Sequence, residues 1–99
     1  MADTAVPRFD EVIHARHRLQ ICALLEPVES LDFATLRETL EVSDSVLSKQ
    51  LRHLTEAGYV DLSKSPHAGR TRTWLSLTPA GRTAFAGHVA ALREIVIAK

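Results

Sequence analysis

Apolar residues in the first part of the chain recur at the spacing of amphipathic helices, in three segments separated by polar residues. Pro27 ends the first segment, and Asp32 and Ser43 are placed to cap the second and the third. Gly58 suits the left-handed position that follows a helix C-terminus. We therefore predict three helices, at about residues 12–25, 33–40 and 44–57. The second and third are about three residues apart, which is the connection of a helix-turn-helix.

After Gly58 the pattern changes to the alternation of apolar and polar residues that is typical of strands. It occurs twice, at residues 59–64 and 71–77, on either side of the turn-forming residues 66–69. These two segments predict a β-hairpin.

The last segment again has helical spacing. Thr78 and Pro79 are the residue types of an N-cap and a first helical position, so we predict a helix from residue 79 to about residue 98. Its large apolar residues form one stripe: Phe85, Val89, Leu92 and Val96. The predicted order is helix, helix, helix, strand, strand, helix, which is a mainly α fold with a small β-hairpin, in the α+β class.

The composition fits one compact domain over residues 1–99, because 99 residues of which 45% are hydrophobic suffice for a single core. No apolar stretch approaches the length of a membrane span. The first residues lack the basic start and apolar run of a secretory signal, so we expect a cytoplasmic protein. Cys22 is the single cysteine, which excludes an intramolecular disulfide. We expect it to be buried in the first helix and not to act as a redox switch.

The charges are unevenly distributed, although 12 basic and 12 acidic residues balance over the whole chain. Residues 26–44 contain six acidic residues and one basic residue, whereas residues 62–99 contain six basic residues and one acidic residue. A locally basic surface can bind phosphate even when the net charge is zero, because binding depends on the charge near the contact.

The third predicted helix has one apolar and one polar face. Leu47, Leu51 and Leu54 fall on one side, and polar residues that include Glu56 fall on the other. A helix presented after a short turn can enter the major groove, where Lys and Arg donate to guanine and Ser bonds base edges or phosphate. We predict that DNA is contacted by Ser45, Ser48, Lys49 and Arg52. The simpler alternative is a polar face that is only solvated.

The predicted hairpin is basic, and no acidic residue lies between Leu62 and Arg93. A basic hairpin next to a DNA-reading helix could lie over the flanking backbone or the minor groove, whose narrow stretches attract arginine. The hairpin residues that we expect at DNA are Lys64, Arg70, Thr71 and Arg72. A solvated loop is again the alternative.

Two segments resemble winged helix-turn-helix transcriptional regulators of the MarR-like group, in a short form that is little more than the DNA-binding domain. Residues 46–60 are similar to the family's recognition helix and following strand, VLSKQLRHLTEAGYV. Residues 77–82 are similar to its strand-to-helix junction, LTPAGR. The resemblance extends over roughly residues 9–95. It implies a homodimer that binds a pseudo-palindromic double-stranded operator, with recognition helices in successive major grooves and the wings alongside.

One residue departs from the family pattern. Glu41 stands in the turn between the second and third helices, where these proteins commonly have glycine. Either Glu41 adopts a left-handed conformation, at a cost of about 1 kcal/mol, or the turn differs here from that of the family.

Dimerisation is also expected because one reading helix covers too few base pairs to specify a genomic site. The last helix is the expected interface, through Phe85, Val89, Leu92, Ile95 and Val96. Packing of this stripe within its own chain is the alternative. A repressor is the expected role, because a protein without a separate activation surface acts most simply by occluding a promoter. The sequence names no small-molecule effector.

Two other functions are weighed against DNA binding by a simple regulator. A winged helix can be a protein-interaction module, in which the same surface meets a partner protein. A metal-responsive repressor of the arsenic-repressor kind is suggested by His14 and His17, which are about one helical turn apart and could share a cation with another chain. No paired-cysteine motif is present and His88 is predicted to stand alone on the last helix, so we assign no metal ligand.

Catalysis is not expected. The sequence has no glycine-rich phosphate loop and no nucleophile elbow, so we predict neither enzyme activity nor a cofactor. RNA binding would require exposed aromatic side chains on which bases can stack. The sequence offers no obvious set of them, and Tyr59 and Trp74 are the only weak candidates for this role.

Overall fold

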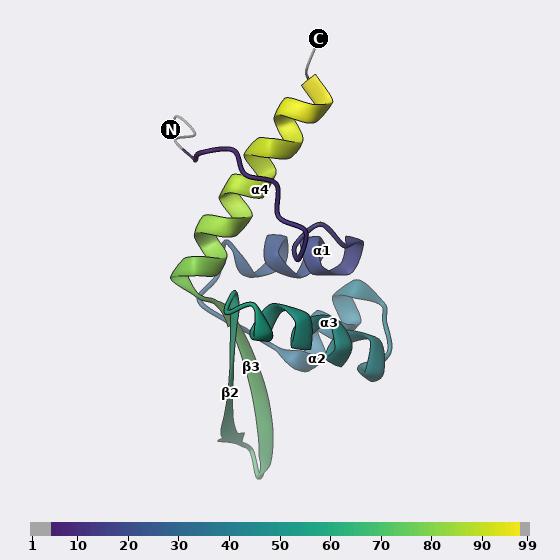
Figure 1. Cartoon of the computed structure of the whole chain (residues 1–99). Coiled ribbons are helices and arrows are strands. Elements are labelled where there is room, and N and C mark those ends of the chain that lie inside the picture. Colours follow the sequence, from purple (N-terminus) through teal and green to yellow (C-terminus); the bar gives the residue numbers. More distant parts are fainter. Residues whose placement is uncertain (1–4, 98–99) are drawn as a thin grey trace.

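The computed structural model describes residues 5–97, except for the side chain of His67. Along the chain the elements are α1 (Arg16–Leu25), β1 (Leu31–Asp32), α2 (Phe33–Leu40), α3 (Asp44–Glu56), β2 (Val60–His67), β3 (Arg70–Leu77) and α4 (Pro79–Ile97). The predicted α+β class and the order of helices and hairpin strands are confirmed, with β1 as an addition. The predicted end of the last helix, Ala98, lies outside the described residues. In Figure 1 the hairpin and the end of α4 project from opposite sides of the helical body.

The first helix begins later than predicted. The carboxylate oxygen Oδ1 of Asp10 accepts the backbone N–H groups of Val12 and Ile13, at 2.9 and 3.0 Å. The N–H of His14 donates to the carbonyl of Asp10 at 3.0 Å. Residues 11–14 form a separate turn that Asp10 caps, and α1 begins only after Ala15, whose extended backbone (φ −69°, ψ 141°) interrupts the helical path.

The short connector after the first helix is a strand. β1 pairs antiparallel with β3, with Leu31 opposite Leu75 and Asp32 opposite Trp74, and the order in the sheet is β1-β3-β2. A strand of two residues shows no alternation in the sequence, and only pairing defines it. Asp32 occupies the predicted N-cap position of α2, and its carboxylate accepts the hydroxyl of Thr35.

The hairpin is longer than predicted, because strand pairing continues from Val60 opposite Leu77 to His67 opposite Arg70. Its turn is Ala68 and Gly69, with φ of 53° and 78°. Two residues with positive φ match the right-handed twist of a hairpin. Pro66 is accommodated within β2, which is an edge strand of the sheet, where a missing N–H is tolerated. We call residues 60–77 the wing.

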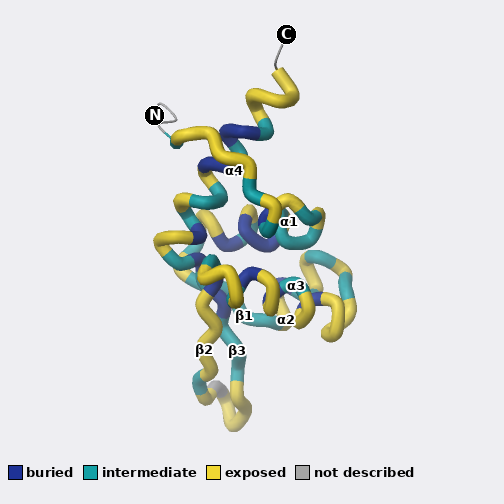
Figure 2. Tube along the Cα trace, viewed as in Figure 1, coloured by how far each residue is buried: buried dark blue, intermediate teal, exposed yellow. Residues whose placement is uncertain are grey.

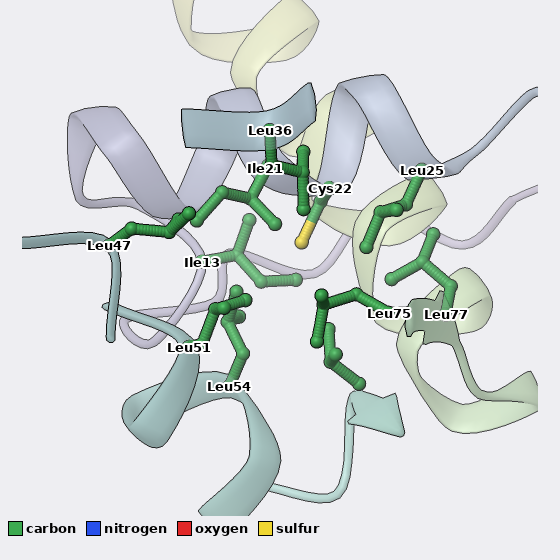
Figure 3. Packing of buried hydrophobic residues seen from close by; sticks show 11 residues of the cluster. Ile13, Ile21, Cys22, Leu25, Leu36, Leu47, Leu51, Leu54, Leu75 and Leu77 are labelled. Atoms are coloured by element: carbon green, nitrogen blue, oxygen red, sulfur yellow. The ribbon is translucent and has the colours of Figure 1, made fainter. Parts of the chain in front are cut away.

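One hydrophobic cluster holds α1, α2, α3 and the base of the sheet together (Figure 3). Leu47, Leu51 and Leu54 of α3 are buried in it, so the predicted core face of this helix is confirmed. Cys22 lies in the cluster with no exposed surface, as expected from the sequence. Figure 2 shows that the buried positions gather in the helical body, whereas most of the wing and the end of α4 are exposed. The cluster orients the polar face of α3 toward solvent.

Candidate nucleic-acid interface

The polar face of α3 is free of contacts with the core. Ser45, Ser48, Lys49 and Arg52 are all exposed. Their helix begins where the Ser43 hydroxyl accepts the N–H of Val46 at 3.2 Å, so the predicted cap at Ser43 is confirmed. The start of α3 is therefore well defined, but contact of these four residues with DNA remains a prediction.

Glu41, which stands in the turn before α3 where the family commonly has glycine, adopts the left-handed conformation. Glu41 has φ 56° and ψ 48°, and its N–H donates to carbonyls at the end of α2. A non-glycine residue in this conformation costs about 1 kcal/mol. The turn thus keeps its helix-turn-helix geometry without glycine.

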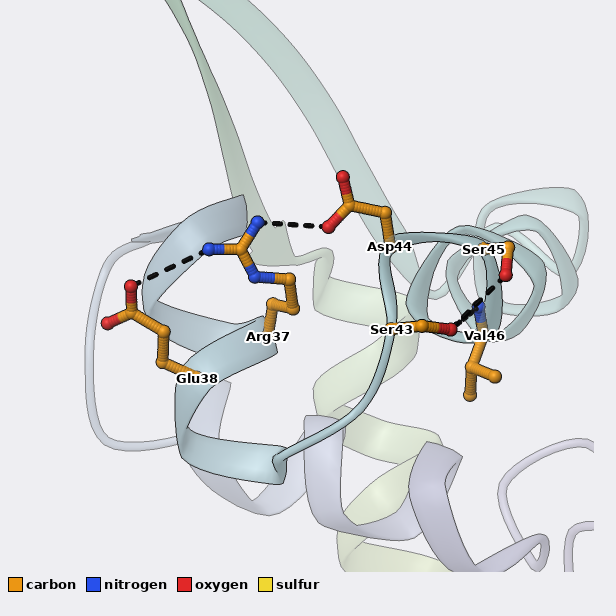
Figure 4. Close-up of polar contacts among 6 residues, drawn as sticks. All are labelled: Arg37, Glu38, Ser43, Asp44, Ser45 and Val46. Carbon is orange, nitrogen blue, oxygen red and sulfur yellow. Dashed lines mark hydrogen bonds and ion pairs between the residues drawn. The ribbon is translucent and has the colours of Figure 1, made fainter.

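An ion pair crosses the same turn (Figure 4). The Nη1 atom of Arg37 in α2 lies 2.9 Å from Oδ1 of Asp44, the first residue of α3, and Nη2 lies 3.6 Å from Oε2 of Glu38. The Asp44 carboxylate raises the pKa of Arg37 above its usual value. Sequence reasoning missed this pair, because residues seven apart in two helices face each other only once the turn is formed.

The four wing residues that are predicted to contact DNA differ in their exposure to solvent. Lys64, Arg70 and Thr71 are exposed, whereas Arg72 is half-buried. The guanidinium carbon of Arg72 lies 5.9 Å from the centre of the Trp74 ring, at the distance of a cation–π contact. The indole N–H of Trp74 donates to the hydroxyl of Ser65 at 3.0 Å, so Trp74 is engaged within the wing. Three of the four predicted wing residues are thus fully available to a ligand.

An open groove of about 540 Å³ lies between the wing and the start of α2. It is lined on one side by residues at the start of α2 and on the other by the turn and first residues of β3. The lining residues are Asp32, Phe33, Ala34, Ala68, Arg70, Thr71, Arg72 and Thr73. The hydrogen bond from Thr35 lowers the pKa of Asp32, and the charge of Arg72 acts in the same direction. Asp32 therefore stays ionised at neutral pH and places a negative charge beside the basic wing.

The predicted dimer stripe divides into two parts. Phe85 packs against the hydrophobic cluster of its own chain, and Val89 and Leu92 are half-buried. Ile95 and Val96 are 62% and 79% exposed, and the neighbouring Ile97 is 72% exposed. The alternative of packing within the chain therefore applies to the first part of the stripe, and the last turns of α4 are uncovered.

The histidines are not arranged as the sequence suggested. His88 is the single histidine of α4 but has a histidine partner from another segment, because its Nε2 lies 3.2 Å from Nδ1 of His14. His14 lies in the turn before α1, so its predicted helical spacing to His17 is wrong. Within residues 5–97 no three His, Cys, Asp or Glu side chains are grouped to hold a metal ion. Over the same residues no helix is long and apolar enough to cross a bilayer.

The fold and the exposed helix after the turn define a winged helix domain. A family model for the winged helix DNA-binding domain matches residues 17–96, and the chain belongs to this family. An uncharacterized protein of Methanocaldococcus jannaschii is 38% identical over 72 residues, which are 73% of this chain and 78% of that protein.

Solved structures have the same fold. The transcriptional regulator homologue protein of Pyrococcus horikoshii OT3 is 23% identical, with a TM-score of 0.83 over 89% of this chain and 87% of that one. The structure of MarR is 15% identical, with a TM-score of 0.74 over 87% of this chain and 64% of that one. The protein therefore has the transcriptional-regulator fold of the MarR kind.

Proposed function

We propose that this protein is a transcriptional regulator that binds double-stranded DNA sequence-specifically as a homodimer and represses by occluding promoters in the cytoplasm. The observation that carries the proposal is the exposed polar face of α3, which follows a short turn and stands opposite a fully buried leucine face. Such a helix can enter a major groove without disturbing the core. Ser45, Ser48, Lys49 and Arg52 then read base edges and phosphates.

The wing supplies the second contact. Lys64, Arg70 and Thr71 lie on the flanking phosphates or in the minor groove, with Arg72 beside them. Residues 26–44 are acidic, so attraction to DNA comes from the α3 face and the wing and not from the molecule as a whole. The orientation of the protein on the duplex follows from this distribution of charge.

The homodimer is built on the last turns of α4. Ile95, Val96 and Ile97 form an exposed apolar group at one end of an elongated molecule. A second copy covers this group together with Leu92 and Val89, and two reading helices then meet two half-sites. Any small-molecule effector would act on this arrangement, and no residue is assigned to one.

The test is fluorescence anisotropy of the purified protein with DNA from upstream of its own gene, and with scrambled DNA, at several salt concentrations. The double variant Lys49→Ala, Arg52→Ala is expected to lower specific affinity about tenfold or more, since each base-reading pair contributes about 1–3 kcal/mol. Arg16→Ala, which removes a charge at the start of α1, is the control and should change affinity little.

The wing is tested with Lys64→Ala, Arg70→Ala. Arg72 is retained because its guanidinium lies over Trp74 and its loss would also disturb packing. We expect binding to every DNA sequence to weaken. The slope of log affinity against log salt concentration should become shallower by the equivalent of about two phosphate contacts. Equal binding to specific and scrambled DNA, unaffected by either double variant, would support a protein-interaction module instead.

The dimer is tested by sedimentation equilibrium. Val96→Asp alters an exposed residue, so the monomer should fold, but a buried charge at the interface should dissociate the dimer. Glu94→Gln on the same helix turn is the control. A wild-type protein that remains monomeric at tens of micromolar contradicts the dimer.

A further inference from the structure

A cluster of aromatic and titratable side chains lies away from α3 and the wing, where the N-terminal segment crosses α4 (Figure 1). The N–H of Arg8 donates to the carbonyl of Gly87 at 2.9 Å. A Cβ on Gly87 would be 3.0 Å from the carbonyl of Val6, so the segment lies directly on the helix. We call residues 8–14 the N-terminal strap.

His88 of α4 holds this strap through its imidazole ring. The ring has no exposed surface, and its Nδ1 lies 2.9 Å from the backbone nitrogen of Asp10, whose N–H it accepts. Its other nitrogen, Nε2, is 3.2 Å from Nδ1 of His14. Since Nδ1 of His88 is an acceptor, the neutral ring carries its proton on Nε2 and donates it to His14. Both contacts require neutral rings, because a second proton on either histidine places two N–H groups against each other.

The rings are packed as well as hydrogen-bonded. Phe9 covers both histidines, with ring centroids 4.6 Å from His14 and 4.8 Å from His88. An imidazolium at His88, whose ring has no exposed surface, would lose its water without gaining an acceptor, which is the costly state of a buried charge.

The strap also reaches the half of the molecule that reads DNA. The hydroxyl of Tyr59, which follows α3 and precedes the wing, donates to Oδ2 of Asp10 at 2.6 Å. Arg18 donates to the carbonyl of Val12 and, at 2.8 Å, to Oε1 of Gln50 in α3. Contacts from the strap therefore extend to α4 on one side and, on the other, to Tyr59 between α3 and the wing and through Arg18 to the middle of α3.

We propose that residues 8–14 form a proton-sensitive strap: neutral His88 and His14 hold it on α4, and protonation of either ring releases it and loosens the junction between α3 and the wing. The release itself does not depend on the proposed function, and only its effect on DNA binding rests on that function.

The charges around His88 set the direction of the response. Burial, and then the neighbouring His14, lower the pKa of His88 below its ordinary value of 6.5, while Asp10 and Glu11 act in the opposite direction. The other titratable groups around Asp10 are Arg8, the Tyr59 hydroxyl and the Cys22 thiol of α1. The unfolded chain takes up the proton at the ordinary value and the folded chain resists it. Stability is therefore retained above about pH 6.5 and falls as the pH drops below it.

The test follows the Asp10 amide and the histidine rings by NMR of the full chain, from about pH 7.5 to about pH 5.5. In the wild type we expect exchange of the Asp10 amide, corrected for intrinsic pH dependence, to accelerate about tenfold or more at the lower pH. In His88→Asn the side-chain oxygen replaces Nδ1 as acceptor and does not titrate, so protection should persist. His17→Asn, outside the cluster, should respond as the wild type does.

A second variant keeps the proposal testable if His88→Asn does not fold. His14 is exposed, so His14→Asn should fold, and it removes the imidazole that accepts the Nε2 proton of His88. Because only one imidazole then remains in the strap contact, release should depend less steeply on pH. Unchanged protection of Asp10 in the wild type at both pH values would overturn the proposal, as would identical release curves for the wild type and His14→Asn.

A measurement of DNA affinity at different pH values distinguishes failure of the strap proposal from failure of the proposed function. At constant ionic strength we expect wild-type affinity to fall several-fold from about pH 7.5 to about pH 6.0, and His88→Asn to keep its affinity. Absence of DNA binding at every pH contradicts the proposed function, whereas the amide exchange still decides the strap. Affinity independent of pH while the strap opens overturns its coupling to α3.

Discussion

Gly81 in α4 lies directly against the backbone carbonyl of Tyr59, so that a Cβ at position 81 would be 2.1 Å from that oxygen. The oxygen cannot move away easily, because it accepts the N–H of Thr78 at 3.0 Å. The hydroxyl of Thr78 in turn accepts the N–H of Gly81 at 2.9 Å and donates to the carbonyl of Gly58 at 2.7 Å. The start of α4 is thereby packed onto the end of α3, and only glycine fits at the contact.

Gly81→Ala is accordingly expected to destabilise the protein. Because the clash is with backbone atoms, the helix start or the wing base must shift, at a cost of about 2–3 kcal/mol. Urea denaturation followed by circular dichroism measures the loss. Ala86→Ser, at an exposed position of the same helix, is the control and should cost well under that amount. A Gly81→Ala protein as stable as this control would contradict the packing.

Glu41→Gly should stabilise the fold. Removing the side chain relieves a left-handed strain of about 1 kcal/mol, and the greater chain entropy of glycine offsets about half of it or more, so we expect a gain of about 0.5 kcal/mol or less. Glu38→Gly is a matched control, since it changes the same residue type inside α2, where glycine costs helix propensity. The two variants should shift the thermal midpoint in opposite directions. A midpoint lowered by both would show that Glu41 is not strained.

Ser43 and Ser48 should separate stability from DNA binding. Ser43→Ala removes the N-cap of α3 and should cost about 1 kcal/mol in denaturant unfolding. Ser48→Ala lies on the exposed face, so it should leave stability almost unchanged while weakening binding to the specific DNA. Anisotropy and urea titration of both variants test this. Equal effects of the two substitutions on both measurements would contradict the assignment.

Cys22 should be unreactive in the native protein. Burial, with a smaller effect of the Asp10 charge, raises the pKa of its thiol to about 12. Thiolate is therefore scarce at pH values near 8, and the sulfur is covered as well. The rate of labelling by a thiol-specific disulfide reagent is expected to follow global unfolding and to rise sharply in denaturant. Fast labelling without denaturant would show that α1 opens locally.

The elements that were predicted correctly from sequence are those governed by near neighbours. The leucine spacing of α3, the cap at Ser43 and the alternation of the wing strands depend on residues within a few positions of one another. For Glu41 the sequence raised two alternatives, a left-handed residue or a different turn, and the folded turn decided for the left-handed residue. The exposed polar residues of α3 also follow from periodicity once the buried face is known.

Long-range contacts could not be read in this way. The pairs Asp10–His88 and Asp10–Tyr59 join residues 78 and 49 positions apart, and Arg37 meets Asp44 only because the turn folds α2 back toward α3. β1 exists because β3 lies beside it. Packing likewise divided the apolar stripe of α4 into a part covered by its own chain and an uncovered end. Local patterns decide which face of an element is apolar, whereas the folded chain decides which surface covers that face and which polar groups meet across it.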